Sequence, residues 1–411
     1  MADMNRNLVV NVLRAETAMS RADLVRATHL SGPTVSAIVT DLVARGLVEE
    51  VGQGQSSGGR RPSLLRLKDD ANHVVGLKLS GQSISLVMTD LRAEPVYSQV
   101  TPLPEGVAAA GPLGRPSRRE TAPAVESLCA AVEAAIASSG ADRSRILGVG
   151  IALAGAVDAT SGLCHFCPTF DWHEVQLGQP IAERLGLPVV LENDSNALTA
   201  AEQWFGSGHG VDHFVVLVVG AGVGAGIVVN GQLHRGADGA AGEFGHIRLG
   251  DDGPQCSCGK TGCVEAWASD RAIVRDLRAA VEAGVPSSLA QAVASGGPTI
   301  AEVGAAADSG DELSQKVLAR AGEQLGRGAA ALIDVVNPRL VIVSGEGVPA
   351  GEWRFGAMRR AIARETFGGI VPRIVMHSEP VDGPKWARGA ACVVLGELFS
   401  TPTKQSLVGA M

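Results

Sequence analysis

The segment that most limits how this chain can fold is the apolar stretch FVVLVVGAGVGAGIVV, from Phe214 to Val229. It holds 16 residues, four of them glycine, which is fewer than the roughly 20 apolar residues that a membrane-spanning helix needs. Since glycine is disfavoured inside helices and strands but suits tight turns, the stretch predicts two buried β-strands joined by a glycine-dense turn. Arg6 and Arg14 interrupt any apolar core of a secretory signal. We therefore expect a cytoplasmic protein that does not interact with membranes.

Strands and helices alternate along most of the chain after residue 70. Strands are expected from His73 on either side of Ser80-Gly81, and a long amphipathic helix over 312–336 is expected to precede the strand that begins at Leu340. The alternation occurs twice, which predicts two α/β lobes. The predicted domains are an N-terminal domain over 1–70, a small lobe over 71–191 completed by a C-terminal helix over 385–400, and a large lobe over 192–384.

The first 70 residues carry the pattern of a winged helix-turn-helix. Ser20-Arg-Ala-Asp23 has the spacing of a capping box at the start of a second helix, and Ser31 precedes a third helix. Two apolar strands then flank the loop GQGQSSGGRRP (52–62), which we predict to be the wing. Residues 1–70 have a net charge of +1 (nine basic against eight acidic residues), whereas the whole chain has a net charge of −8.

This charge contrast favours double-stranded DNA as the partner of the N-terminal domain. We expect the third helix to enter the major groove and the wing arginines to reach phosphates or a narrow minor groove. The alternative is a small helical protein-interaction domain with a flexible basic loop. The predicted DNA-binding residues are Ser31, Thr34, Ser36, Thr40, Arg60 and Arg61.

Several motifs of the body together resemble the ROK family, which includes repressors, open reading frames of unknown role and sugar kinases. The motifs are VVGAGVGAGIVVNGQLHRGADGAAGEFGH (218–246), CSCGKTGCVE (256–265), LENDSNA (191–197) and LVIVSGEG (340–347). The resemblance covers roughly residues 73–400, and it implies a two-lobed actin-like or RNase H-like sugar kinase fold. Behind a winged helix, such a body resembles the transcriptional regulators of the family, which sense sugars and assemble as homodimers or homotetramers.

Three of the seven cysteines lie within eight positions, and His246 precedes them with the spacing H-x9-C-x-C-x4-C. One imidazole and three thiolates are typical of a closed, structural zinc site. The alternative is a set of buried free thiols. ROK proteins use such a metal to shape the wall of the sugar pocket, so the resemblance implies a structural Zn²⁺ here. The predicted metal ligands are His246, Cys256, Cys258 and Cys263.

The resemblance also implies which residues bind a sugar or sugar-phosphate effector. Amides and carboxylates suit this task because they form paired hydrogen bonds with polyols. The predicted ligand-binding residues are Asn193, Asp194, Glu243, His246, Glu265 and Thr169. Asp194 matches the general base of the kinases, and it could also cap the helix that follows. Cys164 and Cys167, near Thr169, are expected to line the pocket, although a redox pair or a metal site is the alternative.

The chain departs from the kinases where their first strand turns to hold phosphate. Family kinases have DxGGT there, but this chain has Lys78-Leu-Ser-Gly-Gln82, so a lysine replaces the metal-positioning aspartate. We therefore predict no catalytic residues, with Asp194 a vestigial base, because phosphoryl transfer depends on that electrostatic stabilisation. The leading hypothesis is a sugar-responsive repressor that binds an inverted-repeat operator. The alternatives are an ATP-dependent sugar kinase with a regulatory DNA-binding domain, and regulation through a protein partner.

Overall fold

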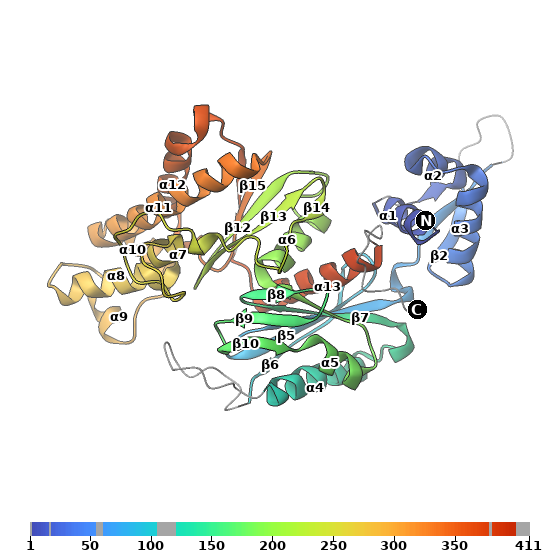
Figure 1. Ribbon diagram of the computed structural model, residues 1–411, viewed down its shortest axis with the longest axis horizontal. Coiled ribbons are helices and arrows are strands. Elements are labelled where there is room, and N and C mark those ends of the chain that lie inside the picture. Colours follow the sequence, from blue (N-terminus) through green and yellow to red (C-terminus); the bar gives the residue numbers. More distant parts are fainter. Residues whose placement is uncertain (1, 16–17, 55–60, 105–120, 378–379, 400–411) are drawn as a thin grey trace. The chain divides into compact units, whose positions relative to one another are not determined.

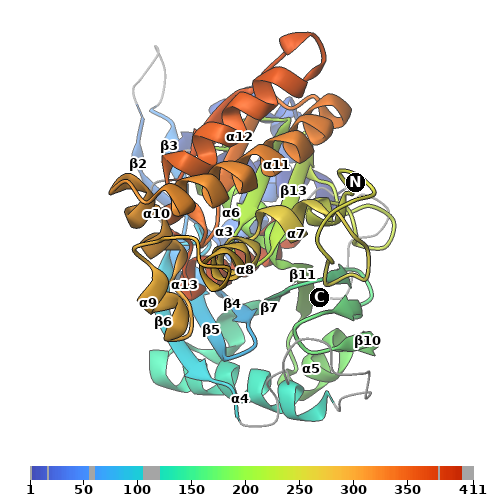
Figure 2. The same ribbon diagram turned by 90° about the vertical axis from the view of Figure 1, so that its left-hand side faces the viewer.

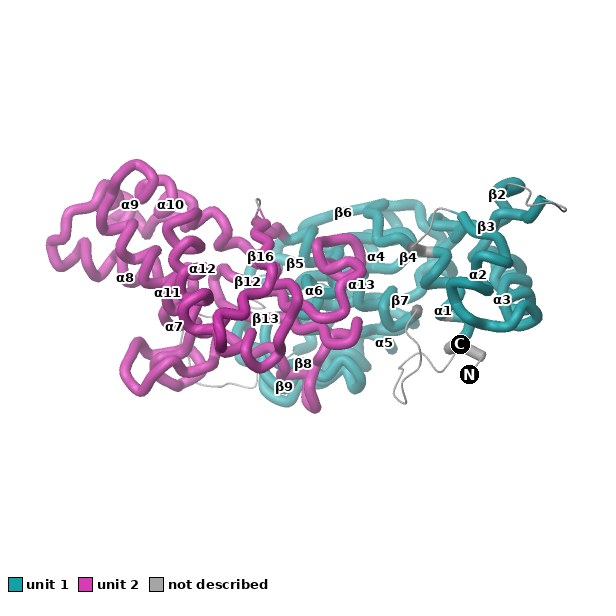
Figure 3. The backbone as a smooth tube through the Cα atoms, turned by 90° about the horizontal axis from the view of Figure 1, so that it is seen from above, with its two compact units in different colours: residues 1–200, 383–411 teal, residues 201–382 magenta. Residues whose placement is uncertain are grey.

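The computed structural model describes residues 2–15, 18–54, 61–104, 121–377 and 380–399. The chain forms two compact units, residues 1–200 with 383–411 and residues 201–382, coloured separately in Figure 3. The chain passes from one unit to the other twice, within helix α6 (Asp194–Phe205) and just before helix α13 (Gly383–Phe399). In the part of the chain that the structure describes, no helix is long and apolar enough to cross a membrane.

The N-terminal part of the first unit is a winged helix-turn-helix, as predicted. Its helices are α1 (Ala2–Ala15), α2 (Arg21–Thr28) and α3 (Gly32–Ala44). Its sheet has the order β1-β3-β2, formed by Met19–Ser20, Ser63–Leu67 and Val48–Gln53 respectively. The core of this part consists of aliphatic side chains from all three helices and the strands, including Val9, Leu13, Leu24, Val35, Val39, Leu42 and Leu65.

Side-chain caps fix where the second and third helices begin. The Ser20 hydroxyl accepts from the Asp23 backbone N–H, and the Asp23 carboxylate accepts from the Ser20 N–H at 2.9 Å, which completes the predicted capping box. Ser31 caps α3 in the same way by accepting from the Thr34 N–H at 3.3 Å. His29, at φ 56°, provides the left-handed turn between the two helices. The turn geometry therefore comes from local hydrogen bonds that the sequence encodes.

A five-stranded sheet is the centre of the rest of the first unit. Its order is β11-β7-β4-β5-β6, formed by Val189–Asn193, Ile146–Leu153, His73–Leu79, Ser83–Thr89 and Pro95–Pro102. Helix α13 packs along β4, β5 and β7, whereas α4 (Ala122–Ser139) and α5 (Gly178–Leu185) pack together on the opposite face (Figure 1). Gly76 and Gly150 allow this close approach, because a side chain at either would run into the backbone of α13.

A second sheet in the first unit carries the loop that contains Thr169. Its order is β10-β9-β8, formed by Trp172–Gln176, Leu163–Cys167 and Ala156–Asp158. Cys164 and Cys167 lie on β9 and belong to the hydrophobic core, and burial raises the pKa of the Cys164 thiol to about 12 and that of Cys167 to about 11. Both thiols are therefore protonated core residues, and neither forms a disulfide.

The second unit repeats the strand order of the first. Its sheet is β14-β13-β12-β15-β16, formed by Gln232–Leu233, Val223–Val229, Phe214–Val219, Leu340–Ser344 and Arg373–Met376. In each unit an antiparallel three-stranded meander is followed by two parallel strands. The apolar stretch that begins at Phe214 forms the predicted hairpin, β12 and β13. The fold-class prediction is confirmed: a winged helix-turn-helix precedes two related α/β lobes.

Helices of the second unit cover its sheet and carry the cysteine loop. They are α7 (Val264–Ala268), α8 (Asp270–Glu282), α9 (Ala290–Ala294), α10 (Ile300–Asp308), α11 (Glu312–Val336) and α12 (Glu352–Glu365). Helices α11 and α12 run alongside each other (Figure 2). Arg354 on α12 is fully buried, and its guanidinium donates to Asp270 at 2.8 Å and to the carbonyls of Ala268 and Gly347. This arginine ties α12 to the start of α8 and to the loop after β15.

Candidate functional site

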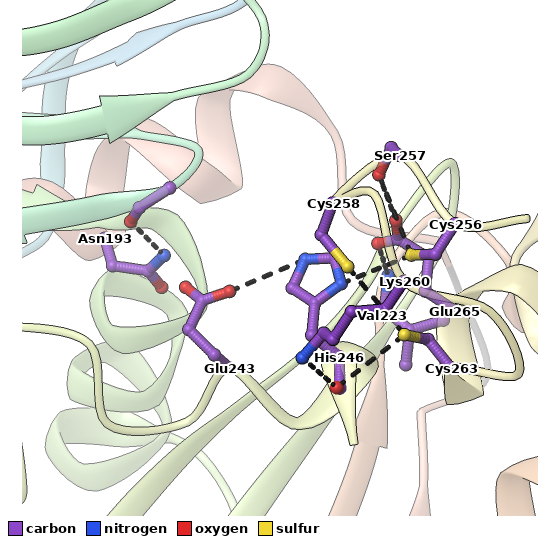
Figure 4. Close-up of polar contacts among 11 residues, drawn as sticks. Asn193, Val223, Glu243, His246, Cys256, Ser257, Cys258, Lys260, Cys263 and Glu265 are labelled. Atoms are coloured by element: carbon purple, nitrogen blue, oxygen red, sulfur yellow. Dashed lines mark hydrogen bonds and ion pairs between the residues drawn. The ribbon is translucent and has the colours of Figure 1, made fainter. Parts of the chain in front are cut away.

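His246 and the three cysteines of the loop converge in the second unit, as Figure 4 shows. The His246 Nδ1 lies 3.5 Å from the Cys256 Sγ, and the Sγ atoms of Cys258 and Cys263 are 3.8 Å apart. All four potential ligand atoms lie within 4.8 Å of one another. Cys256 and Cys263 are buried, and Cys258 lies nearer the surface. The sequence-predicted set of four ligands is thus brought together.

These distances fit a metal with four tetrahedral ligands. A Zn–S bond of about 2.3 Å places two sulfur ligands about 3.8 Å apart, which is the separation that Cys258 and Cys263 show. Burial and the neighbouring thiols raise the pKa of the Cys263 thiol to about 12. A buried thiol of this kind loses its proton only where a cation replaces it, and zinc does so. The residues present therefore fit a closed zinc site.

Turns of the cysteine loop position the ligands. The Cys256 N–H donates to the Lys260 carbonyl at 2.8 Å, and the Gly259 N–H donates back to the Cys256 carbonyl at 3.0 Å. Gly259, at φ 87°, allows this tight reversal. The Lys260 ammonium donates to the His246 carbonyl at 2.9 Å, which ties the cysteine loop to the backbone of His246. The local sequence thus holds the sulfur atoms near His246.

Two carboxylates next to this cluster were predicted to bind ligand, and the cluster positions both. Glu265 accepts from the Ser257 hydroxyl at 3.1 Å, and Ser257 lies between two of the cysteines. The other oxygen of Glu265 accepts from the Val223 N–H at 3.1 Å. The Glu243 carboxylate lies 3.7 Å from the His246 Nε2, the ring nitrogen opposite the one that faces Cys256 (Figure 4). The cysteine loop therefore fixes the orientation of Glu265 and of the His246 ring.

The glycine turn between β12 and β13 is closed by acidic groups. The Glu265 carboxylate takes up the Val223 N–H and lies beside Gly222. The Glu346 carboxylate lies directly against Gly220, where a side chain on the glycine would overlap it. Backbone N–H groups of such turns hold phosphate when they are free and when no negative charge lies over them. Here the Glu265 carboxylate takes one of these N–H groups and the Glu346 carboxylate places a second negative charge beside the turn, which disfavours phosphate.

Lys78 and Asp194, both in the first unit, form an ion pair. The Lys78 Nζ lies 2.6 Å from the Asp194 Oδ2, and the side chains are 13% and 21% exposed. Lys78 is near the end of β4, Asp194 directly follows β11, and the strand between them carries the small Ala152 in register with Lys78. The two side chains meet at one edge of the sheet, where the carboxyl ends of parallel strands place functional groups.

Side-chain hydrogen bonds from Ser80 occupy the backbone groups of the turn after Lys78, so these groups are not free to bind phosphate. The Ser80 hydroxyl accepts from the backbone N–H groups of Gln82 and Ser83, and it donates to the Ser83 carbonyl at 2.9 Å. The methyl group of Thr169 packs against Gly81. The side chain of Ser80 thus satisfies two backbone amides of this turn, which leaves them unavailable to a phosphate.

Asn193 caps helix α6, the role that the sequence offered as an alternative for Asp194. Its Oδ1 accepts from the Asn196 N–H at 3.2 Å, and its Nδ2 donates to the Gly155 carbonyl at 2.9 Å. Asp194 is itself the first residue of the helix, and its Oδ1 accepts from the Ser195 N–H at 2.8 Å. The capping alternative for Asp194 is therefore wrong, because the helix begins one residue earlier than an aspartate cap requires.

The predicted DNA-binding residues of α3 are at the surface of the winged helix. Ser31, Ser36 and Thr40 are exposed and Thr34 is half-buried. Thr40 donates to the Ser36 carbonyl at 2.8 Å, and the hydroxyls of Ser31 and Thr34 are 2.8 Å apart, so some of these groups bond within the helix.

The basic residues around α3 differ in how far their charge is neutralised. Arg61 is exposed and forms no ion pair with any residue that the structure describes, whereas Arg60 lies outside the described residues. Four other arginines pair with carboxylates, namely Arg21, Arg26, Arg45 and Arg66. Such exposed pairs contribute little to stability, so these arginines can exchange a carboxylate for a phosphate at small cost.

Sequence reasoning missed how the departures from the kinase pattern fit together. The sequence showed only that Lys78 replaces an aspartate of the kinases. Its bond to Asp194 could not be predicted, because the two residues are 116 positions apart. Glu346 was part of a quoted motif, but no local pattern indicated that its carboxylate lies against Gly220. The one available signal is a lysine within the mostly apolar strand β4, because a half-buried ammonium needs an acidic partner.

Comparisons with known proteins agree with this geometry. The model of the ROK family matches residues 108–392, and that of the MarR family matches residues 7–61. The xylose repressor of Caldicellulosiruptor bescii is 27% identical over 97% of both chains. The glucokinase of Thermotoga maritima is 38% identical over 60% of this chain and 78% of its own. The crystal structure of a ROK family transcriptional regulator, a homologue of the E. coli MLC protein, superimposes with a TM-score of 0.83 over 97% of both chains at 24% identity, which shows the fold.

Proposed function

We propose that this chain, which belongs to the ROK family, is a DNA-binding transcriptional repressor whose body senses a sugar. The observation that carries the proposal is the ion pair between Lys78 and Asp194. An aspartate that serves as a general base must be free to take the proton of a substrate hydroxyl. Here the Oδ2 of Asp194 accepts from the Lys78 ammonium at 2.6 Å, so the aspartate is not free to act as a base. The winged helix of the same chain would instead transmit the binding of a sugar to DNA.

The winged helix supports the DNA-binding part of the proposal. Small polar side chains on α3 suit close approach to the floor of the major groove, and Arg61 at the base of the wing suits a phosphate or a narrow minor groove. One winged helix contacts too few bases to select one operator in a genome. The proposal therefore includes a homodimer or homotetramer on an inverted repeat, in which symmetric copies read two half-sites.

The body supports the sensing part of the proposal. Glu243, His246 and Glu265 lie around the cysteine loop in one unit, and Asn193, Asp194 and Thr169 lie at the sheet edge of the other. We propose that these residues bind the sugar and that a structural Zn²⁺ on His246 and the three cysteines holds the first set in place. The zinc would supply rigidity alone, because four protein ligands leave no open position for catalysis.

A sugar kinase is the second candidate, favoured by the identity to a glucokinase. Three features of this chain disfavour it. Lys78 holds Asp194, the Ser80 hydroxyl closes the first turn, and the Glu346 carboxylate lies against Gly220 of the second turn. Each opposes the binding of a polyanionic nucleotide or the activation of a hydroxyl. Regulation through a protein partner on the body is a third candidate, which operator binding that no sugar changes would favour.

The test of the proposed function is a footprint and a mobility shift on the DNA upstream of the genes beside this one, with and without sugars. Symmetric protection of an inverted repeat that a sugar weakens is the expected result. Arg61→Ala should lower affinity, and it should reduce the salt dependence by about one unit in slope if the side chain touches only phosphate. The matched control is Lys316→Ala, which removes an exposed cation of α11, outside the winged helix. Asymmetric protection, or no response to any sugar, would overturn the proposal.

A further inference from the structure

The Lys78–Asp194 ion pair is both held in place and partly accessible, which suits a pair that binds a ligand. The Lys78 Nζ lies 5.3 Å from the centroid of the Trp386 ring, on the first turn of α13, and 2.6 Å from the Asp194 Oδ2. An aromatic face and a carboxylate both attract an ammonium, so the lysine is fixed from two directions. Trp386 is itself buried, at 4% exposed, and provides a rigid support.

The hydrogen-bonding capacity of the pair is only partly used. An ammonium has three donor hydrogens, and the bond to Asp194 takes one of them. The Asp194 carboxylate accepts from Lys78 through Oδ2 and from the Ser195 N–H through Oδ1, and each oxygen has a further lone pair. The side chains keep 13% and 21% of their surface exposed. The accessible face therefore presents a donor and an acceptor beside each other.

A hydroxyl group is the ligand group that matches such a face. It donates one proton and accepts one or two hydrogen bonds at the same oxygen. We propose that Lys78 and Asp194 together recognise one free hydroxyl of the effector, with Asp194 accepting its hydrogen and Lys78 donating to its oxygen. Lys78 is thus a ligand-binding residue, and the effector is a neutral sugar. This inference rests on the proposed function, since it names the chemical class that the sensor takes.

The charge of the pair explains why a phosphate ester would be rejected at this position. The ammonium is already neutralised by Asp194, so the pair offers no surplus positive charge to a dianion. A phosphate at the same place would lie next to the Asp194 carboxylate, and like charges at contact distance repel strongly where water is partly excluded. A free hydroxyl meets no such repulsion. The pair therefore selects the free sugar over its phosphate ester.

The experiment measures binding of D-glucose, D-xylose and N-acetyl-D-glucosamine, and of the phosphate monoester of each, to the full-length protein by calorimetry. The parent sugar that binds best should bind at least tenfold more tightly than its ester. No binding by any of the six compounds would overturn the proposed sensor function, and this inference with it. Tighter binding of the ester would overturn this inference alone and leave a sensor of sugar phosphates.

Two variants should shift the preference in opposite directions, which a merely structural pair would not do. Lys78→Met leaves Asp194 without its counter-charge, so the free sugar should bind at least tenfold more weakly and the ester should be rejected still further. Asp194→Asn releases the ammonium, so the ratio of ester affinity to sugar affinity should rise at least tenfold. Lys316→Met, which removes an exposed lysine from a surface pair on α11, is the matched control and should change neither affinity.

The double variant Lys78→Met/Asp194→Asn keeps the test decisive if either single variant fails to fold, because it leaves no unpaired charge. It should bind the free sugar at least tenfold more weakly than the wild type. Because both groups act on one hydroxyl, its loss should be smaller than the product of the two single losses. A cooperative calorimetric unfolding transition of the first unit, which carries both substituted residues, shows that each variant is folded. Wild-type sugar affinity in the double variant, or in Lys78→Met, would overturn the assignment.

Discussion

Replacing Cys258 by serine should remove the metal and, with it, the response to sugar. Cys258 is the ligand nearest the surface, so Cys258→Ser changes the coordination of the metal and little of the core. Three ligands remain, and a hydroxyl is a poor replacement for a thiolate as a zinc ligand. Without the metal, the Cys256–Lys260 turn loses its anchor, and Ser257 no longer holds the Glu265 carboxylate at 3.1 Å. Zinc binding and sugar binding should therefore be lost together.

The size of the effect on stability follows from mass action. A metal present at a thousand times its dissociation constant adds about 4 kcal/mol to the stability of the state that binds it. A folding unit of the size of residues 201–382 shifts its midpoint by about 2–4 °C for each kcal/mol. Cys258→Ser, or chelation of the wild type, should therefore lower the calorimetric midpoint of that unit by about 8–16 °C.

The assay combines elemental analysis with calorimetry, with and without chelator. The wild type should hold about one zinc per chain, and the matched control Cys129→Ala should too, because it removes a buried thiol from helix α4, far along the chain from the cluster. A wild-type zinc content in Cys258→Ser would refute the ligand assignment. A metal-free protein that still responds to sugar would refute the structural coupling between the metal and Glu265.

Four further outcomes are expected. A coupled assay with ATP and each sugar should detect no turnover near the order of 1–100 s⁻¹ that is typical of kinases, and turnover in that range would favour the kinase. Arg354→Ala should destabilise the protein by about 3–5 kcal/mol in a denaturant titration, because it leaves the Asp270 carboxylate and two carbonyls without their buried partner. Asp311→Ala should cost about 0.5–2 kcal/mol by removing the cap of α11. Although burial opposes it, bonds from Ser314 and Ser288 lower the pKa of Asp311 below 3.8, so this contribution should be present at neutral pH and fade as the pH falls below that value. Gly150→Ala should destabilise by about 1–3 kcal/mol, since its methyl group would overlap the backbone of α13, whereas Gly32→Ala, which meets nothing within 4 Å, should not.

The sequence predicted those parts of the fold that local chemistry determines. The capping box at Ser20 and the cap at Ser31 were found because their hydrogen bonds join residues three positions apart. Helix α11 spans 312–336 as expected, because its apolar face repeats regularly and Asn337-Pro338 ends it. The four candidate metal ligands could be predicted for the same reason, since three of them lie in one loop.

What the sequence did not predict depends on contacts between distant segments. Glu346 reaches Gly220 and Arg354 reaches Asp270 only because strands and helices far apart in the chain become neighbours. No spacing rule covers such pairs. The residue that caps α6 was also not predicted, because both Asn193 and Asp194 are good caps by residue type. The choice between them is made by Gly155, whose carbonyl accepts from the Asn193 amide and fixes that side chain.

The lysine at position 78 can be understood by comparing it with the two alternatives. A carboxylate there would place two negative charges side by side and would need a metal ion to neutralise them. An apolar residue would leave the half-buried Asp194 without a partner, which is costly. Lysine neutralises Asp194 with a bond of 2.6 Å that requires neither metal nor nucleotide. In the second unit, Ser257 and the Val223 N–H hold Glu265 in a way that likewise requires no nucleotide. If both carboxylates bind the sugar, as we propose, each is oriented before any ligand arrives. The affinity of such a sensor would then depend on the sugar and on its structural zinc, and a change in the concentration of ATP or magnesium would leave it unaltered.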